Sequence, residues 1–233
     1  MDAQLSPHFV VEKRIHPDEH GCANRTLNVP GIDLCRDGVA TSAVDEIDLL
    51  RSYEYGLLAA VLLRAPGRDL LTRIAGLAGD ITPLGGAHTA LAEAAAGTQT
   101  DTLQREFFDL FIGVGRGELQ PYASYYLTGF LNERPLMRVR DDLAKIGLER
   151  SGTVHEPEDH IGLLCEIMAG LTSGLFEVPS NAHRAFFERH LKPWAMRFFT
   201  DLETSRSARF YCRVGTLGRL FMHVEAEAFD MDE

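Results

Sequence analysis

The densest group of side chains able to do chemistry is the run His155-Glu156-Pro157-Glu158-Asp159-His160, which combines imidazoles and carboxylates. Both groups are ordinary ligands of Zn²⁺. A zinc protease helix needs its two histidines four residues apart on one face, whereas His155 and His160 are five apart with Pro157 between them. The spacing therefore favours a polar loop that leads into a helix. A metal-dependent hydrolase built on His155, Glu156, Asp159 and His160 remains an alternative.

The same run is expected to connect two apolar, helical halves of the chain. Asp159 would lie near the N-terminus of the next helix, where a carboxylate can accept backbone N–H groups and complement the helix dipole. Residues 148–160 are polar and contain Gly152 and Pro157, which predicts a mobile hinge. Exchange of halves at such a hinge would give a domain-swapped dimer, so a monomer and a swapped dimer both remain open.

Other candidate sites are weaker. The segment Gly113-Val114-Gly115-Arg116-Gly117 follows a predicted helix and matches neither glycine-rich phosphate-binding spacing, so it is interpreted as a turn. The set His16, His20, Cys22 and Cys35 matches no standard zinc arrangement. Cys165 lies on an apolar helical stripe, where a thiol is inert, and no pair of nucleophile and base is recognisable.

Aromatic side chains form the remaining candidate. Tyr122, Tyr125 and Tyr126 cluster in one segment, and Trp194 follows later in the chain. Tyrosine and tryptophan combine a large apolar body with a polar tip, so they serve equally well in a core and in the wall of a groove. The sequence alone leaves both uses open.

The elements that must position these groups are helices. After Thr41 apolar residues recur at helical spacing in nearly every segment, most clearly in the last stripe of Phe210, Val214, Leu217, Phe221 and Val224. Pro121 and Pro135 suit first helical turns, and Gly147 suits a helix C-terminus. The expected fold is all-α, a single helical bundle of about eight to ten helices. The expected boundaries are an irregular arm over 1–41, the helical domain over 42–226, with Ser42 capping its first helix, and a solvated or frayed acidic tail over 227–233.

Composition excludes several classes of protein. The 233 residues include 23 basic and 34 acidic side chains, a net charge of −11, so nucleic acid and anionic membranes would be repelled. The longest apolar run, Leu57 to Leu63, is far shorter than the roughly 18 residues of a membrane span. No secretory signal begins the sequence, and the four cysteines form no C-x-x-C pair. A cytoplasmic protein without stable membrane insertion is expected.

Four segments in order resemble one family, the TorD/DmsD/NarJ-like redox-enzyme maturation chaperones. They are the helix end Leu110-Phe111-Ile112-Gly113, the element Pro121-Tyr122-Ala123-Ser124-Tyr125-Tyr126, the loop Glu156-Pro157-Glu158-Asp159-His160-Ile161 and the element His190-Leu191-Lys192-Pro193-Trp194. The resemblance covers about residues 42–225. The first 40 residues have no counterpart in it.

The resemblance implies a cytoplasmic chaperone, not an enzyme, for a molybdenum-cofactor oxidoreductase. Such proteins bind the twin-arginine signal peptide or another part of the apo-enzyme and hold it until the cofactor is inserted. It implies no resident cofactor, although weak guanine-nucleotide binding is sometimes attributed to the family. The motif positions carried over as partner-binding residues are Tyr122, Ser124, Tyr125, Glu156, Pro157, Asp159, His160 and Trp194. A helical adaptor of another pathway is the second alternative.

The implied ligand is cationic at one end and apolar at the other. Carboxylates such as Asp159 and Glu156 could pair with its guanidinium groups, and aromatic faces could take the apolar part. The expected site is therefore an acidic rim around Asp159, beside a groove lined by Tyr122, Tyr125 or Trp194.

Overall fold

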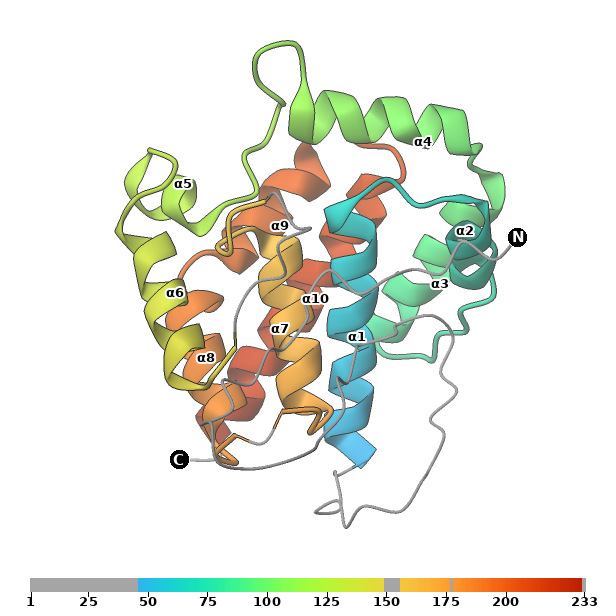
Figure 1. Cartoon of the computed structure of the whole chain (residues 1–233). Helices are drawn as coiled ribbons and strands as arrows, with labels where there is room; N and C mark the ends of the chain where they lie inside the picture. The colour runs from blue at the N-terminus through green and yellow to red at the C-terminus, as the bar shows by residue number, and fades with distance from the viewer. Residues whose placement is uncertain (1–45, 149–155, 177, 232–233) are drawn as a thin grey trace, which may run out of the picture.

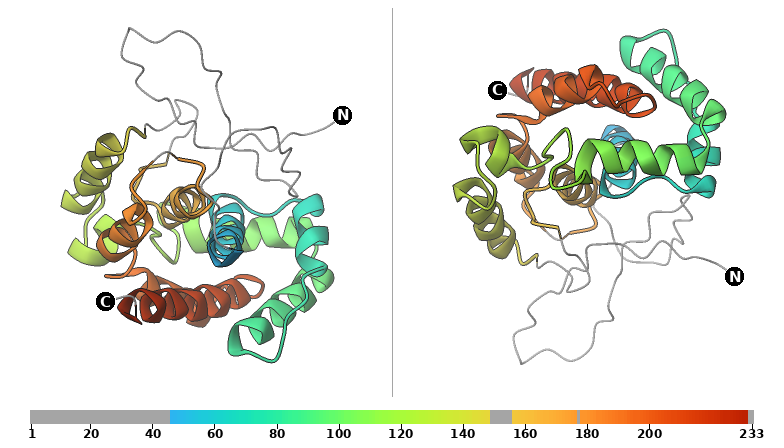
Figure 2. Two further views of the ribbon diagram at one scale, coloured as in Figure 1. Left: turned by 90° about the horizontal axis from the view of Figure 1, so that it is seen from below. Right: turned by 90° about the horizontal axis from the view of Figure 1, so that it is seen from above.

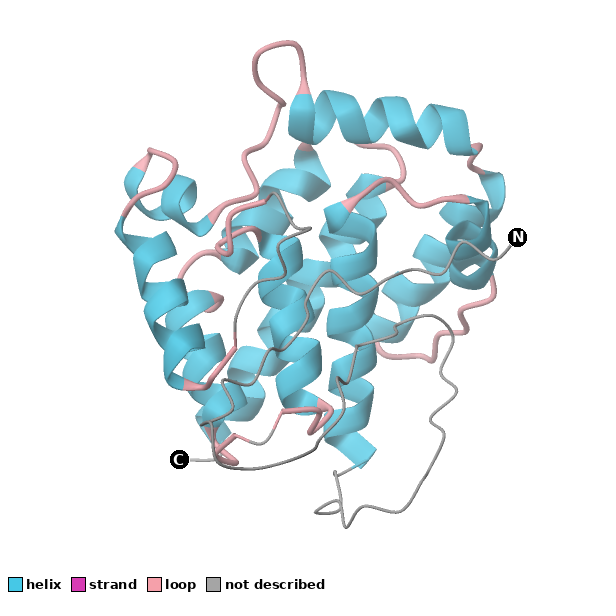
Figure 3. Ribbon diagram, viewed as in Figure 1, coloured by secondary structure: helices cyan, strands magenta, loops and turns pink. Residues whose placement is uncertain are grey.

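A computed structural model describes residues 46–148, 156–176 and 178–231. This part of the chain contains ten α-helices and one π-helical turn, with no strand (Figure 3). They are α1 (Glu46–Leu63), α2 (Arg68–Ala75), α3 (Pro83–Gly97), α4 (Thr100–Phe107), η1 (Phe108–Ile112), α5 (Ala123–Thr128), α6 (Arg134–Lys145), α7 (Ile161–Thr172), α8 (Ala182–His190), α9 (Ala195–Thr204) and α10 (Tyr211–Met231). The predicted all-α fold of eight to ten helices is confirmed.

Helix ends follow local chemistry. Thr82 caps α3 by accepting a hydrogen bond from the Gly85 N–H at 3.0 Å, and Pro83 occupies the first turn. Pro135 occupies the first turn of α6 as predicted. The helix expected to start at Pro121 is shorter than predicted. It begins only at Ala123, so the placement of Pro121 in its first turn is wrong. It ends at Thr128 because Gly129 takes a left-handed φ of 84°, which leaves Phe130 exposed.

The core is built around α1 and α7, which lie side by side at the centre of Figure 1. Every residue of α7 is buried, so this helix is covered by its neighbours on all sides. α10 lies across them on one side, packed against α9, while α2 and α3 stand at one end (Figure 2). Gly218 on α10 allows close packing of α10 against α9, because a Cβ at this position would lie 2.3 Å from the Phe199 ring on α9.

Two buried acids fasten α10 to distant parts of the chain. Glu225 accepts hydrogen bonds from Arg51 Nε at 2.7 Å and from the Tyr55 hydroxyl at 2.7 Å, both on α1. Glu106 on α4 accepts the backbone N–H groups of Arg209 and Tyr211 at 2.7 and 2.8 Å, where α10 begins. Carboxylates at a helix N-terminus satisfy donors that the helix itself leaves unpaired.

The C-terminal end differs from the sequence-based expectation. α10 continues to Met231, beyond the predicted domain end at 226, and Phe229 is buried against Phe187 with ring centroids 5.2 Å apart. Residues 227–231 are thus helical rather than frayed, although Glu227, Asp230 and Met231 are exposed, as expected for a solvated tail. The predicted arm over 1–41, the Ser42 cap and most of the predicted hinge, residues 149–155, lie outside the described residues.

Candidate functional site

Two motif segments that are far apart in the sequence are joined by backbone hydrogen bonds. The Ala123 N–H donates to the Asp159 carbonyl at 3.0 Å, and the Ile161 N–H donates to the Pro121 carbonyl at 2.8 Å. The bonds form an isolated antiparallel bridge between Tyr122 and His160, whose rings meet edge-on at 5.2 Å. This junction holds the start of α5 against the start of α7.

Asp159 is fully buried at this junction and does not form a rim. Its Oδ2 accepts the Ser124 N–H at 2.8 Å, so the carboxylate caps α5 rather than the helix that follows it in the sequence. His160 takes the position next to α7 instead, with Nδ1 accepting the Gly162 N–H at 3.0 Å. The prediction of an exposed acidic rim around Asp159 is therefore wrong.

The other acids of the loop are also committed to neighbours. The Tyr122 hydroxyl donates to Glu156 Oε2 at 2.5 Å, and Arg140 Nε donates to Glu158 Oε2 at 2.9 Å. Burial, reinforced by the Glu156 carboxylate, raises the pKa of Tyr122. Pro157 is half-buried between these two acids. The loop therefore packs against the start of α5 and against α6, and its acids hold these elements in place.

Trp194 lies in the core rather than in the wall of a groove. It is buried, and its Nε1 donates to the His190 carbonyl at 2.7 Å. Its ring contacts Tyr126 at 5.3 Å and Phe198 at 6.0 Å between centroids. Ser124 is buried as well. Of the eight predicted site residues, Tyr125 alone lines the pocket described next.

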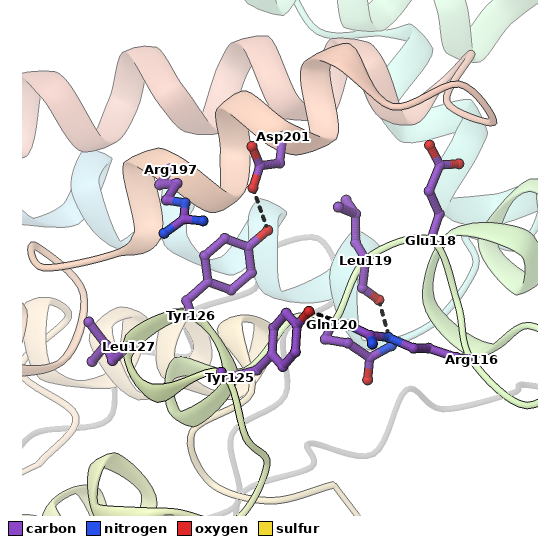
Figure 4. Close-up of a pocket in the computed structure, with 10 residues that line it drawn as sticks. Arg116, Glu118, Leu119, Gln120, Tyr125, Tyr126, Leu127, Arg197 and Asp201 are labelled. Carbon is purple, nitrogen blue, oxygen red and sulfur yellow. Dashed lines mark hydrogen bonds between the residues drawn. The ribbon is translucent and has the colours of Figure 1, made fainter.

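A surface pocket of about 420 Å³ opens beside this junction, between the segment before Pro121, α5 and α9 (Figure 4). Its walls combine tyrosines, arginines, acids and a few apolar groups. The lining residues are Arg116, Glu118, Leu119, Gln120, Tyr125, Tyr126, Leu127, Gly129, Arg197 and Asp201.

The glycine segment positions one wall of the pocket. Gly113 adopts a φ of 63°, and the chain folds back so that the Leu119 N–H donates to the Leu110 carbonyl at 2.8 Å. A Cβ at Gly117 would lie 2.5 Å from the backbone of Phe111, so only glycine fits there without displacing η1. The interpretation of this segment as a turn is confirmed, and the turn places Arg116 at the pocket.

Each pocket arginine lies over a tyrosine ring. The Arg116 guanidinium is 4.8 Å from the Tyr125 centroid and donates to its hydroxyl, and Arg197 is 5.5 Å from the Tyr126 centroid. The Tyr126 hydroxyl donates to Asp201 Oδ2 at 3.0 Å. Burial, together with the Asp201 carboxylate, raises the pKa of Tyr126. These contacts hold both tyrosine rings in fixed orientations at the pocket.

Sequence reasoning missed both arginines. Arg197 and Asp201 are four residues apart, one turn of α9, and lie on the same face as they do in the pocket. This spacing, in the helical turn after Trp194, is the one sequence feature that could have placed Arg197 and Asp201 together on one face. Arg116 offered none beyond its place in a glycine-rich turn.

Neither a metal site nor a membrane span is found in the described residues. No group of three or more histidine, cysteine, aspartate or glutamate side chains there could hold a metal ion, although His155 of the alternative hydrolase site lies outside those ranges. In the same ranges no helix is long and apolar enough to cross a membrane. Cys165 is buried in α7, which raises the pKa of its thiol.

Comparison with known proteins places this architecture in a family. The nitrate reductase delta subunit family matches residues 78–200, a span that includes η1, the junction and every pocket residue except Asp201. The chain belongs to the nitrate reductase delta subunit family. The resemblance to redox-enzyme maturation chaperones read from the sequence is thus confirmed.

Individual relatives agree with this assignment. The chain is 27% identical over 135 residues to the chaperone protein TorD of Aliivibrio fischeri, covering 54% of this chain and 63% of that one. It is 31% identical over 122 residues to TorD of Aliivibrio salmonicida, covering 48% and 57%. The chain therefore spans about three fifths of the length of these relatives. A crystal structure of a proposed redox enzyme maturation protein from Archaeoglobus fulgidus shares the fold, with a TM-score of 0.52 at 22% identity over 82% of this chain and 98% of that one.

The capping role of Asp159 in this family member leads to a stability prediction. We expect Asp159→Ala to lower the free energy of unfolding by about 1–2 kcal/mol, because the α5 N-terminus loses its acceptor. Asp159→Asn keeps an acceptor oxygen and should lose less. Asp141→Ala, an exposed carboxylate on α6, is the control and should melt like the wild type. Urea denaturation monitored by circular dichroism measures all three, and an Asp159→Ala protein as stable as the control would contradict the assignment.

Proposed function

We propose that this protein is a cytoplasmic maturation chaperone for a molybdenum-cofactor oxidoreductase. It binds the twin-arginine signal peptide, or another part of the apo-enzyme, and holds the client until the cofactor is inserted. The observation that carries the proposal is the family match over 78–200 together with relatives whose name is chaperone protein TorD.

The geometry supports binding of a polypeptide rather than chemistry on a small substrate. The pocket presents two tyrosine rings and the exposed side chain of Leu127, and exposed Phe130 follows directly in the chain. Surfaces of this kind bind apolar segments of a partner. We propose that Tyr125 contacts the client, and that Tyr122, Ser124, Glu156, Pro157, Asp159, His160 and Trp194 contribute by holding α5 in place.

The test is capture of the client by the tagged protein in its native host. We expect mass spectrometry to identify a molybdenum-cofactor oxidoreductase subunit in its apo form, retained several-fold less by Tyr125→Ala. Tyr53→Ala, a partly exposed tyrosine on α1, is the matched control and should retain as much client as the wild type.

A synthetic peptide separates the two modes of client recognition. Calorimetric titration compares a twin-arginine signal peptide with its twin-lysine version. Tighter binding of the arginine form supports signal-peptide recognition, because guanidinium groups pair with carboxylates in two-point fashion. Capture of no molybdoenzyme subunit, with no binding of either peptide, would overturn the proposed function.

A further inference from the structure

The two pocket arginines have no acidic partner in the part of the chain that the structure describes. Arg116 and Arg197 are both exposed, and neither makes an ion pair with a carboxylate of the described residues. Arg116 contacts the ring and the hydroxyl of Tyr125, and Arg197 contacts the Tyr126 ring. An arginine has five N–H donors, so most of the donor capacity of each guanidinium is still available.

The two acids of the pocket are engaged elsewhere. Asp201 accepts the Tyr126 hydroxyl at 3.0 Å. Glu118 accepts the backbone N–H groups of Arg206 and Ser207 at 2.7 and 3.1 Å, in the connection between α9 and α10. These bonds use acceptor atoms of the two carboxylates without cancelling their charge. What the pocket offers a ligand is therefore the unused N–H donors of Arg116 and Arg197.

Apolar surface lies between the positive charges. Figure 4 shows Tyr125 and Tyr126 next to each other, with Arg197 beside one ring and Arg116 beside the other. The two rings meet nearly perpendicular, at 81° and 6.1 Å between centroids. Leu127 adds an aliphatic side chain that is 44% exposed. A matching ligand carries negative groups on either side of an apolar body.

We propose that this pocket binds an acidic, apolar segment of the client protein, with carboxylates at Arg116 and Arg197 and an apolar side chain against Tyr125 and Leu127. This inference rests on the proposed function for the nature of the occupant and adds its chemistry. Two arginines of a twin-arginine motif would meet Arg116 and Arg197 here, and the pocket's two carboxylates already accept hydrogen bonds from the protein. We therefore assign this pocket to a different part of the client. Because the whole chain carries a net charge of −11, attraction of an acidic segment is confined to short range, and recognition depends on the local pair.

Three peptides of one sequence test the charge preference by fluorescence anisotropy. Each has a leucine-rich centre with glutamate, glutamine or arginine at the same flanking positions. We expect the glutamate peptide to bind about tenfold more tightly than the glutamine peptide, and the arginine peptide to bind most weakly. In the double variant Arg116→Gln/Arg197→Gln the glutamate and glutamine peptides should bind within twofold of each other.

The matched control replaces two arginines remote from the pocket. Arg138→Gln/Arg213→Gln changes two exposed residues on α6 and α10 and the net charge by the same amount. This variant should keep the tenfold preference, and circular dichroism melts should be unchanged in both double variants. Equal binding of the glutamate and glutamine peptides by the wild type, no binding of the glutamate peptide, or an equal loss in the control variant would each overturn the proposal.

Two further experiments distinguish the possible explanations of these results. In the first, inorganic phosphate is titrated alone. If phosphate binds in an arginine-dependent way and the glutamate peptide does not bind, the pocket takes small anions. That result would overturn the proposal that its occupant is an acidic protein segment. Client capture is repeated with the Arg116→Gln/Arg197→Gln protein. Retained capture together with no peptide preference defeats this inference and leaves the proposed function intact, whereas peptide preference without any molybdoenzyme client defeats only the proposed function.

Discussion

Replacing Glu225 with alanine is expected to lower the free energy of unfolding by about 3 kcal/mol. Glu225 is almost fully buried on α10 and accepts three hydrogen bonds from α1, two from Arg51 at 2.7 and 2.8 Å and one from Tyr55 at 2.7 Å. Removing one partner of a buried pair leaves an uncompensated charge, which costs about 3–5 kcal/mol. The lower value is expected because Arg51 keeps a bond to Asp48 at 2.8 Å.

The chain supplies a matched control for this variant. Glu203 binds Arg219 through two contacts of 2.7 and 3.2 Å, but both side chains are partly exposed. Glu203→Ala should therefore lower the free energy of unfolding by about 1 kcal/mol or less. Guanidinium chloride denaturation compares the two, and Glu225→Gln, which keeps an acceptor, should fall between them. Equal losses in Glu225→Ala and Glu203→Ala would show that burial of the pair contributes nothing.

Lowering the pH from 7 to 5 is expected to remove about 2 kcal/mol of stability through His160 alone. Burial lowers the pKa of this imidazole to about 4, against an ordinary value of 6.5, with Glu156 acting in the opposite direction. Between these two values the unfolded chain binds the proton and the folded chain does not, so stability falls as the pH falls below 6.5. The pKa difference over this interval gives the 2 kcal/mol.

His160→Asn isolates this contribution. Asparagine is a good helix cap and can accept the Gly162 N–H as Nδ1 of His160 does, but it does not titrate. The difference in unfolding free energy between wild type and His160→Asn should therefore change by about 2 kcal/mol between pH 7 and pH 5. His223→Asn, at an exposed position on α10, should follow the wild type at both pH values. A pH-independent difference for His160→Asn would contradict a buried neutral imidazole.

The all-α fold could be predicted from the sequence because each helix has a local pattern of apolar spacing and of residues at its ends. The spacing of the last apolar stripe predicts one buried face. Phe210, Val214, Leu217 and Phe221 are buried, whereas Val224, its last member, is 45% exposed. Proline and glycine at helix ends act through their own backbone geometry, so their effect is visible without any tertiary contact. Pro135 illustrates this, since it occupies the first turn of α6 as predicted.

The candidate site was less accessible because it depends on partners distant in the chain. A carboxylate next to a helix start predicts a cap, yet Asp159 caps α5, 35 positions before it, rather than α7. The exposed or buried state of Asp159 and Trp194 depends on how α5, α7 and α9 meet, which no local pattern encodes. Arg116 reaches the pocket only because the turn after Gly113 folds back on η1.

The junction between residues 121–123 and 159–161 also closes a loop in the chain. Residues 121–123 and 159–161 are hydrogen-bonded to each other. The two ends of the segment that contains α5 and α6 are therefore fixed relative to each other. Lengthening a closed loop costs little, about 0.6 kcal/mol for each doubling. A change of length between the two ends of this loop would therefore alter the pocket wall that carries Tyr125, while α9 keeps Arg197 in place and the packing of α1 against α7 is untouched.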